Sequence, residues 1–448
     1  MTEVSRRAFL GRAGLAAGGV AVGGASLGVL AACTDSESTQ NGARPAEPLD
    51  PQDWATVRDQ FALSRDLLQF AAFVLASPPR QVTEAISEHR ARLDEDTNGY
   101  LNTMEPALDS AVITAAATYL ETEPETIALT DSTTMGLGLV YSGIRFRPGQ
   151  ELLTSEHDFY ATHEALRMRA ARDGVGVRRV KLYDYAGTAS VDQIVTRLGD
   201  AITPAIRAVA LTWVHSGTGV KLPVAEIAAE IRSRATALGM ERPLLCLDGV
   251  HGFGVEDTSP AELGCDFLIS GAHKWLFGPR GTGLVWAAAQ SWAELDLSIP
   301  SFAPEVVGAY IQNLEPVGVA PGAAATPGGY KAFEQRWALA ETFAFHEALG
   351  RDRVAERTRV QATQLKEGLA ELGGVRVVTP MEPELSSGIV CLAIEDASIF
   401  ELPAVLREQH GLIASVTPYS LPHLRLGPSI VTSPDDVDAA VRAIDKVR

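Results

Sequence analysis

Short apolar runs recur through the middle of the chain, and each is followed by a polar or glycine-bearing turn and then by a helical pattern. They occupy residues 127–130, 208–213, 244–247 and 267–270. Continuous apolar runs bounded by turn residues are typical of strands that are buried on both faces. Because such strands alternate with helices between about residues 125 and 290, the pattern predicts a mostly parallel sheet with helices on both faces.

The pattern changes after about residue 300. A loop rich in glycine, alanine and proline precedes long amphipathic helical stretches, and the last part of the chain mixes short strands with helices. We therefore expect a large α/β domain and a smaller α+β domain at the C-terminus. The predicted divisions are a signal segment over 1–33, a flexible tether over 34–50, the N-terminal segment and large domain over 51–305, and the small domain over 306–448.

Composition narrows the class of protein. The 448 residues provide for about two domains, and the formal net charge of −18 without a basic patch argues against nucleic-acid binding. The four cysteines form no CxxC pair and no metal-ligand spacing. Cys246 and Cys265 lie in or beside apolar runs, where we expect buried thiols; a disulfide between them stays open at this point.

The N-terminus resembles an export signal. Residues 5–11 read SRRAFLG, which is similar to a twin-arginine signal, and a Gly/Ala-rich apolar stretch follows. Residues 30–33, LAAC, resemble a bacterial lipobox in which Cys33 would be lipidated; the alternative is an uncleaved N-terminal anchor. The resemblance predicts export across the bacterial cytoplasmic membrane to the periplasm or cell surface, with membrane contact only through a lipid anchor at Cys33.

The most informative stretch is 244–286, LLCLDGVHGFGVEDTSPAELGCDFLISGAHKWLFGPRGTGLVW. Asp248 follows one apolar run and Lys274 the next. A charged residue just past a buried parallel strand lies at the carboxyl edge of the sheet, where ligands bind in open α/β folds. A lysine amine and a carboxylate at that edge suit pyridoxal phosphate (PLP), because the amine forms a Schiff base with its aldehyde and the carboxylate pairs with its ring nitrogen.

The order D-G-x-H and then S-x-x-H-K-W-L-x-G-P-x-G-x-G resembles the PLP site of class V aminotransferase-fold enzymes. That family includes cysteine desulfurases, isopenicillin N epimerase-like enzymes and hercynylcysteine sulfoxide lyases. The resemblance covers roughly residues 60–445 and implies PLP-dependent fold type I. Without it, Asp248 could be read as a helix cap and Lys274 as a surface lysine.

The resemblance also implies roles at the phosphate end of PLP. The S-T-T turn at 132–134 resembles the family's phosphate cup, which assigns Thr133 and Thr134, and His273 would contact the same group. Thr326 partly matches an element that reaches the phosphate of the partner subunit in a homodimer. Read alone, the hydroxyl cluster is a helix N-cap and Thr326 belongs to a surface loop.

Four further residues are assigned to the ring and the substrate by resemblance. His157 would stack on the cofactor ring, His251 would contact its hydroxyl, and Ser216 lies where relatives often carry an asparagine near the ring or substrate. Arg425 would grip the substrate carboxylate, to which a guanidinium can bind bidentately. Gly427 replaces the serine of the family's R-x-S strand, so the departure weakens any claim about one substrate. The alternatives are a loop histidine at 157 and a structural arginine at 425.

The implied reaction begins with an amino acid or related amine that forms an external aldimine, from which Lys274 removes a proton. Epimerase, aminotransferase and C–S lyase outcomes stay open. A cysteine desulfurase is disfavoured, because residues 412–424 contain no cysteine and Cys391 lies in an apolar run. The alternative outside enzymology is a lipid-anchored binding protein that kept the fold and lost the chemistry.

Overall fold

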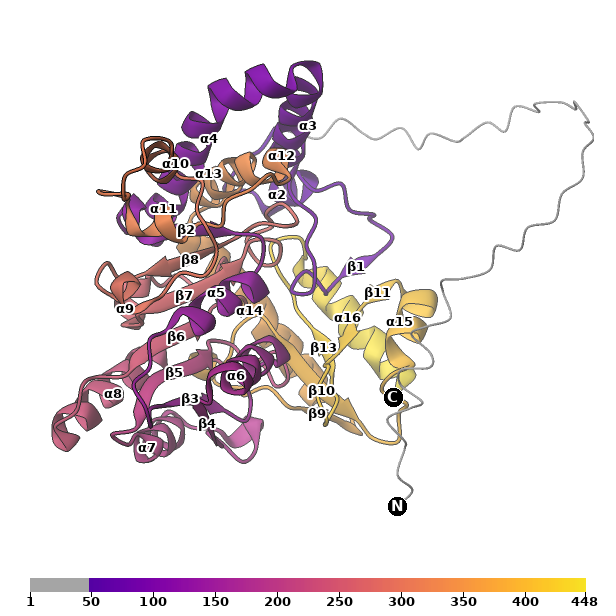
Figure 1. Cartoon of the computed structure of the whole chain (residues 1–448). Helices are drawn as coiled ribbons and strands as arrows, with labels where there is room; N and C mark the ends of the chain where they lie inside the picture. The colour runs from indigo at the N-terminus through magenta and orange to yellow at the C-terminus, as the bar shows by residue number, and fades with distance from the viewer. Residues whose placement is uncertain (1–47) are drawn as a thin grey trace, which may run out of the picture. The chain divides into compact units, whose positions relative to one another are not determined.

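A seven-stranded sheet organises residues 48–448, the part of the chain that this computed structural model describes (Figure 1). The strand order is β2-β8-β7-β6-β5-β3-β4. All neighbours pair in parallel except β8, which runs antiparallel to both β2 and β7. The strands are β2 (Ile127–Thr130), β3 (Glu151–Ser155), β4 (Gly176–Val180), β5 (Ile206–Thr212), β6 (Leu244–Asp248), β7 (Phe267–Gly271) and β8 (Gly283–Ala287). The predicted mostly parallel sheet is confirmed.

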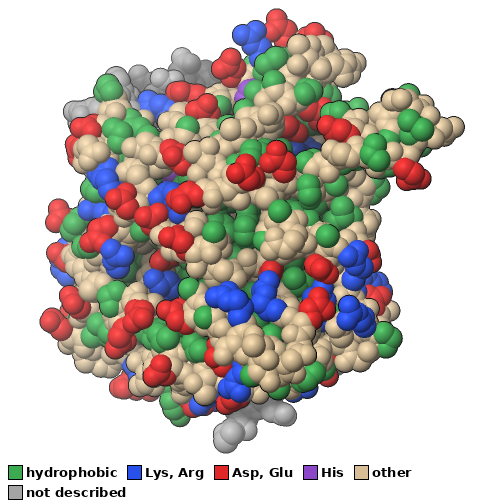
Figure 2. Space-filling view, turned by 90° about the vertical axis from the view of Figure 1, so that its left-hand side faces the viewer, with side chains coloured by type: hydrophobic (Ala, Val, Ile, Leu, Met, Phe, Trp, Pro, Cys, Tyr) green, Lys and Arg blue, Asp and Glu red, His purple; other side chains and the backbone are tan. Residues whose placement is uncertain are grey.

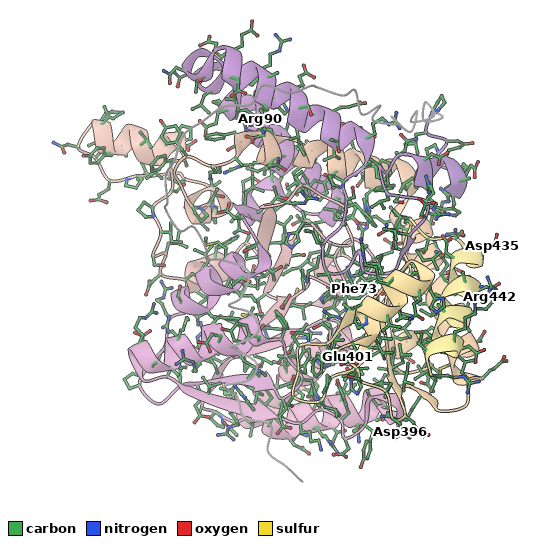
Figure 3. All side chains as sticks on the ribbon, turned by 90° about the vertical axis from the view of Figure 1, so that its right-hand side faces the viewer. Phe73, Arg90, Asp396, Glu401, Asp435 and Arg442 are labelled. Carbon is green, nitrogen blue, oxygen red and sulfur yellow. The ribbon has the colours of Figure 1, made fainter. Side chains whose placement is uncertain are left out.

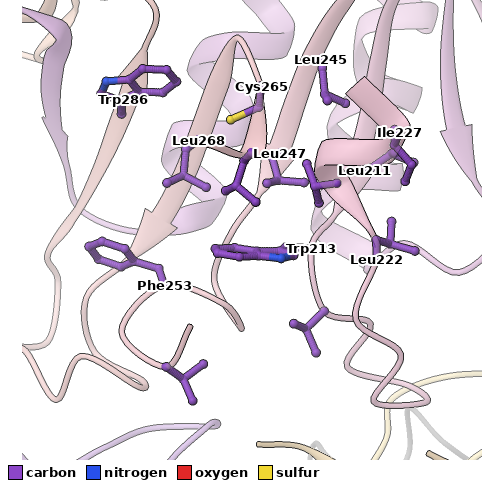
Figure 4. Close-up of a cluster of buried hydrophobic side chains, with 14 of the residues drawn as sticks. Leu211, Trp213, Leu222, Ile227, Leu245, Leu247, Phe253, Cys265, Leu268 and Trp286 are labelled. Carbon is purple, nitrogen blue, oxygen red and sulfur yellow. The ribbon is translucent and has the colours of Figure 1, made fainter. Parts of the chain in front are cut away.

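Alternate residues of the strands point to two different hydrophobic layers, as the pleat requires. Leu245 and Leu247 of β6 belong to one buried cluster, whereas Leu244 and Cys246 belong to the other. The first layer lies under helices α4 (Thr97–Leu120), α7 (Val191–Ala201), α8 (Val224–Leu238) and α13 (Leu339–Leu349), and part of it is drawn in Figure 4. The second lies under α5 (Thr133–Gly143) and α6 (Tyr160–Asp173). The strands are therefore covered on both faces.

A second, four-stranded antiparallel sheet lies in the C-terminal part, in the order β12-β13-β10-β9. Its strands are β9 (Val375–Val377), β10 (Val390–Ile394), β12 (Ser415–Val416) and β13 (Leu424–Leu426). Helices α14 (Arg351–Ala370), α15 (Leu402–His410) and α16 (Pro434–Val447) share a buried cluster with it. This is the predicted small α+β region.

The N-terminal segment joins the two parts. Strand β1 (Leu68–Gln69) pairs in parallel with β11 (Leu412–Ile413). Helix α2 (Trp54–Asp59) is capped by the Asp53 side chain, and α3 (Arg80–Glu95) begins directly after Pro79. Shorter helices are α9 (Pro260–Leu263), α10 (Pro304–Ile311), α11 (Pro321–Ala325) and α12 (Phe333–Trp337), with 3-10 turns η1 (Pro124–Thr126), η2 (Ala186–Thr188), η3 (Ser291–Glu294) and η4 (Pro383–Leu385).

The predicted export signal and Cys33 fall within residues 1–47, outside the described residues. Between residues 48 and 448, no helix is long and apolar enough to cross a membrane. The domain division at 305/306 stays a prediction.

The sequence did not decide whether Cys246 and Cys265 form a disulfide, and the structure has both as free thiols. Cys246 and Cys265 are both buried, and each belongs to a different hydrophobic layer of the sheet. Their side chains therefore pack on opposite sides of the sheet and do not form the disulfide.

Candidate active site

Lys274 sits in a tight turn just past the carboxyl end of β7. The main-chain amide of Phe277 donates to the Lys274 carbonyl (2.9 Å), which closes the turn. Phe277 adopts a left-handed backbone with φ 56°, a conformation that costs a non-glycine residue about 1–3 kcal/mol. Its buried ring packs edge-on against Phe61 with 5.1 Å between centroids, and this packing holds the strained residue in place.

The Lys274 amine lies beside His251, and the hydrogen bonds of this histidine determine which ring nitrogen carries the proton. Nζ lies 3.4 Å from Nε2 of His251, and the Trp275 indole donates to Nδ1 of the same ring at 3.3 Å. Burial holds the pKa of His251 well below its usual value, so the ring is neutral. Because Nδ1 accepts, the proton lies on Nε2 and points at Lys274. Burial also lowers the pKa of Lys274 to about 8, although Asp248 raises it.

Asp248 is the last residue of β6, the strand beside β7. One carboxylate oxygen accepts from the Val250 amide at 3.2 Å. Burial raises the pKa of Asp248 to about 6, while the Val250 amide and Lys274 lower it. At neutral pH the carboxylate is ionised, and a protonated partner would offset the free-energy cost of burying its charge. The structure thus brings Asp248, His251 and Lys274 together, as expected for residues that follow adjacent parallel strands.

Thr133 and His273 both lie close to Gly271, where a Cβ atom would be 3.2 Å from the Thr133 hydroxyl and 2.9 Å from the His273 ring. The Gly271 amide donates to the Thr133 hydroxyl at 2.8 Å, which leaves the hydroxyl proton free to donate elsewhere. Nδ1 of His273 is buried and has no hydrogen-bond partner within residues 48–448. Thr134 is exposed in the first turn of α5, whose N-cap is Ser132. The free hydroxyl proton of Thr133 and the unpartnered ring nitrogen of His273 lie beside a helix N-terminus, which is suited to an anion.

His157 follows β3 and is stacked against an aromatic residue that the sequence did not single out. Its ring is parallel to Tyr183, with 3.8 Å between centroids and 8° between planes. The Tyr183 hydroxyl bonds to Nδ1 of His215 and to Thr218, each at 2.9 Å. Burial lowers the pKa of His157 to about 3 and keeps its ring neutral. One face of the His157 ring is therefore fixed by Tyr183, and only the other face can stack on a ligand.

Arg425 on β13 reaches Ser216 at the end of the β5 segment. Nε donates to the Ser415 hydroxyl (2.8 Å) and Nη1 to the Ser216 carbonyl (3.2 Å). The guanidinium also lies over the Phe73 ring, 5.0 Å from its centroid. The Phe73 ring is buried, and Figure 3 labels it together with surface residues such as Arg90 and Asp435. The arginine predicted for the substrate carboxylate is thus held from three directions.

The departure of Gly427 from the family's serine has a steric reason. A Cβ atom at position 427 would lie 2.4 Å from the Phe73 ring. Any side chain there would displace the ring that supports Arg425. Beside this region, Val74, Leu75 and Ser415 line a cavity of about 320 Å³.

Comparison with known proteins decides the family. The model for "Aminotransferase class-V" matches residues 111–416. The chain belongs to the class-V aminotransferase family. This family is PLP-dependent, so the chain is a PLP-dependent enzyme.

Individual relatives differ in their reactions. The chain is 26% identical to an isopenicillin N epimerase of Streptomyces clavuligerus over 88% of this chain and 98% of that protein. It is 27% identical to a probable cysteine desulfurase of Xylella fastidiosa over 54% of this chain and 58% of that protein.

Solved structures confirm fold type I. A variant of C-DES with glycine covalently linked to its PLP cofactor superposes with a TM-score of 0.77 at 20% identity, over 87% of this chain and 99% of that chain. The cysteine desulfurase CsdA of Escherichia coli superposes with a TM-score of 0.72 at 20% identity, over 90% of this chain and 99% of that chain.

The residues of this class-V enzyme fit the cofactor. The Lys274 amine is nucleophilic when neutral, and its lowered pKa makes that form accessible near neutral pH. The buried Nδ1 of His273 lacks a partner among the described residues, as a phosphate ligand would require. The buried Asp248 carboxylate would pair with a protonated ring nitrogen. The individual roles of these residues stay predictions.

Thr326 uses its hydroxyl within its own chain. It donates to the Gly322 carbonyl (2.9 Å) and accepts from the Leu129 amide (3.1 Å). These bonds place it at the end of β2, beside the start of the phosphate cup. Its predicted contact with a partner subunit's PLP stays a prediction.

Two residues near the predicted site were not found by sequence reasoning. Tyr183 lies shortly after β4, so its position near a strand end was an available signal. Tyr419 lies in the loop between β12 and β13 and meets Ser216 across more than two hundred residues. No local pattern marks a contact of that kind.

Proposed function

We propose that this class-V enzyme is an epimerase that acts on the α-carbon of an amino acid or related amine. The observation that carries the proposal is the Lys274 amine, which lies 3.4 Å from Nε2 of His251 and whose pKa burial lowers to about 8, with Asp248 and Arg425 as the charges that act on it. An amine of this kind can remove the α-proton near neutral pH, and inversion requires that a proton then reach the carbon from the opposite face. Relatives that span most of the chain are named isopenicillin N epimerases, which supports this branch.

Each residue has a physical task in this proposal. PLP supplies the electron sink for the pair that remains when the α-proton leaves. Lys274 holds the cofactor and then moves the α-proton, while Asp248 keeps the ring nitrogen protonated. Thr133, Thr134 and His273 bind the phosphate.

The other side chains orient the ring and the substrate. His157, backed by Tyr183, excludes water from one face of the ring. His251 donates its Nε2 proton to the ring hydroxyl, and Ser216 lines the same region. Arg425 binds the substrate carboxylate, which sets the bond that lies perpendicular to the ring.

A cysteine desulfurase is the competing proposal, since several relatives carry that name. A persulfide-forming thiol must be accessible and ionisable. Cys391 is fully buried, and burial raises the pKa of its thiol to about 12. Cys246 and Cys265 are buried as well. The thiols in the described part of the chain therefore favour the epimerase.

Exchange of the α-proton tests the reaction. The loaded enzyme is incubated with single L-amino acids in D2O, and each is followed by proton NMR and chiral chromatography. We expect the α-proton signal of a substrate to disappear while its epimer accumulates, because Lys274 exchanges its protons with solvent. Release of sulfide or persulfide would replace the proposal by a lyase or desulfurase, and an oxo acid would replace it by an aminotransferase.

We further propose that the enzyme is exported by its twin-arginine-type signal and anchored through lipid at Cys33. The motifs at 5–11 and 30–33 support this, and the route carries folded proteins, so PLP can be bound before export. In a bacterial host, Cys33→Ser is expected to move the protein from the membrane to the soluble exported fraction. Arg6→Lys with Arg7→Lys should retain it in the cytoplasm. Unchanged membrane partition of the Cys33 variant would contradict the anchor.

We also propose a homodimer. Apolar side chains that are mostly exposed gather on α10 and the segments around it, namely Phe302, Tyr310, Ile311, Leu314, Val317 and Tyr330. In Figure 3 the ribbon of α10 projects from the body, and the projecting segment in Figure 2 carries hydrophobic side chains. An exposed apolar patch of this kind supports burial by a second copy. Thr326 lies on the same connection, as a residue near a shared site would.

A further inference from the structure

We propose that Tyr419 is a substrate-binding residue whose phenol hydroxyl, together with Arg425, holds the carboxylate of the amino-acid substrate. The inference rests on the proposed function, because it assigns a role toward that substrate. Tyr419 lies in the loop that immediately precedes the Arg425 strand. At this place a cysteine desulfurase would require its thiol, and here the chain carries a phenol instead.

The loop around Tyr419 is closed at its base and tied to the site. The Thr417 amide donates to the His423 carbonyl (2.9 Å), and the His423 amide donates to the Thr417 hydroxyl (2.8 Å). Nδ1 of His423 lies 3.1 Å from the Gly217 carbonyl. Thr417 and His423 are both buried. The loop is thus attached to the turn after β5 that also bears Ser216.

Tyr419 and Arg425 meet at Ser216. The Tyr419 hydroxyl lies 2.8 Å from the Ser216 hydroxyl, and Nη1 of Arg425 donates to the carbonyl of the same residue. The phenol and the guanidinium therefore flank one residue, the first at its side chain and the second at its main chain. A carboxylate bound by the guanidinium would therefore lie near the phenol.

Tyr419, Ser216 and Arg425 have hydrogen-bond donors that find no acceptor among the described residues. Two hydroxyls that bond to each other use one of their two protons, so Tyr419 and Ser216 retain one proton to donate. Nη2 of Arg425 has no hydrogen-bond partner within residues 48–448. A carboxylate has two oxygens and accepts from both kinds of donor. The unused donors match a substrate carboxylate.

The backbone is shaped to admit the phenol ring. A Cβ atom at position 217 would lie 2.9 Å from two carbons of the Tyr419 ring, so glycine makes room for it. On another side, the Phe159 ring centroid is 6.3 Å away in an edge-on arrangement. The Tyr419 side chain thus contacts Phe159, Ser216 and Gly217. The Lys274 side chain lies in a different environment, beside His251 and Trp275.

The charge environment keeps the phenol protonated. Burial raises the pKa of Tyr419 above its usual value, Asp158 and Asp248 add to the rise, and Arg425 and the bond from Ser216 oppose it. A protonated phenol donates a hydrogen bond and does not act as a base near neutral pH. This agrees with a binding role for Tyr419.

The test compares Tyr419→Phe with wild type, both loaded with PLP, by titration of the cofactor absorbance. The probes are L-alanine and L-cysteine, each paired with the amine that lacks the carboxylate, ethylamine and cysteamine. We expect the dissociation constants of the amino acids to rise roughly 10-fold to 100-fold, because one hydrogen bond to a charged group is lost. Those of the amines should stay unchanged, as should the affinity for PLP.

Two further variants sharpen the result. Tyr185→Phe removes an exposed hydroxyl of the same kind and should change nothing. Gly217→Ala displaces the Tyr419 ring without removing its hydroxyl and should reproduce the selective loss. Equal losses for amino acids and amines, or no loss, in a Tyr419→Phe variant that binds PLP would overturn the inference. Failure of the PLP-loaded wild type to respond to any amino acid, the two probes included, would instead overturn the proposed function, and this inference with it.

Discussion

Replacing Lys274 by alanine is expected to abolish the Schiff-base absorbance of the loaded enzyme and to lower turnover by roughly 10²-fold to 10⁴-fold, the contribution of a positioned acid–base group. The variant removes both the cofactor's covalent partner and the group that moves the α-proton. Its surroundings, His251 and the turn closed by Phe277, stay in place. Absorbance spectra after addition of PLP, together with turnover of the substrate found by NMR, measure both effects.

The control for this variant is Lys446→Ala, which removes an exposed lysine near the end of α16. It should retain the spectrum and the activity of wild type. If Lys274→Ala bound PLP with the same spectrum as wild type, Lys274 would not be the cofactor lysine. If neither protein bound PLP, the binding-protein alternative would replace the enzyme.

Replacing Asp248 by asparagine is expected to lower turnover by roughly 10²-fold to 10³-fold, corresponding to about 3–4 kcal/mol for a lost partner in a buried charge pair. Asparagine keeps the side-chain oxygen that accepts from Val250 but carries no charge to hold a proton on the ring nitrogen. PLP should still attach, because Lys274 and the phosphate ligands are untouched. We expect steady-state turnover to fall while the dissociation constant for PLP stays unchanged, and measuring both separates loss of catalysis from loss of the cofactor.

The same variant makes a prediction about pH with a definite sign. The neutral form of Lys274 is the nucleophile, so the rate of PLP attachment to the wild-type apoprotein should rise with pH and level off above about 8. The Asp248 carboxylate raises the pKa of Lys274. Its removal should therefore move the midpoint to a lower pH. A midpoint that stays or rises would contradict the assigned pairing, and Asp94→Asn, at an exposed and remote position, provides the control.

The parts of the fold that could be predicted are those governed by local pattern. The buried strands β6 and β7 appear in the sequence as apolar runs, and the residues that follow them, Asp248 and Lys274, meet because parallel strands end at one edge. The antiparallel direction of β8 could not be predicted in this way. Its run is as apolar as the others, and only its pairing with β2 and β7 shows the direction.

The site was predictable where a residue follows a strand and not where it depends on a distant contact. Tyr419 reaches the site through a hydrogen bond to Ser216, a contact between distant parts of the chain that no spacing reveals. Phe73 illustrates the limit in another way. It lies in a turn shortly after β1, and its role beneath Arg425 emerges only from the packing of its ring.

The most direct test of the central claim is to map the PLP attachment site. The loaded wild-type protein is reduced with borohydride, digested, and analysed by peptide mass spectrometry. The account predicts one modified peptide, with the pyridoxyl phosphate mass on Lys274. A protein without the modification, or with it on another lysine while Lys274 is unmodified, would contradict the assignment of this lysine as the centre of the active site.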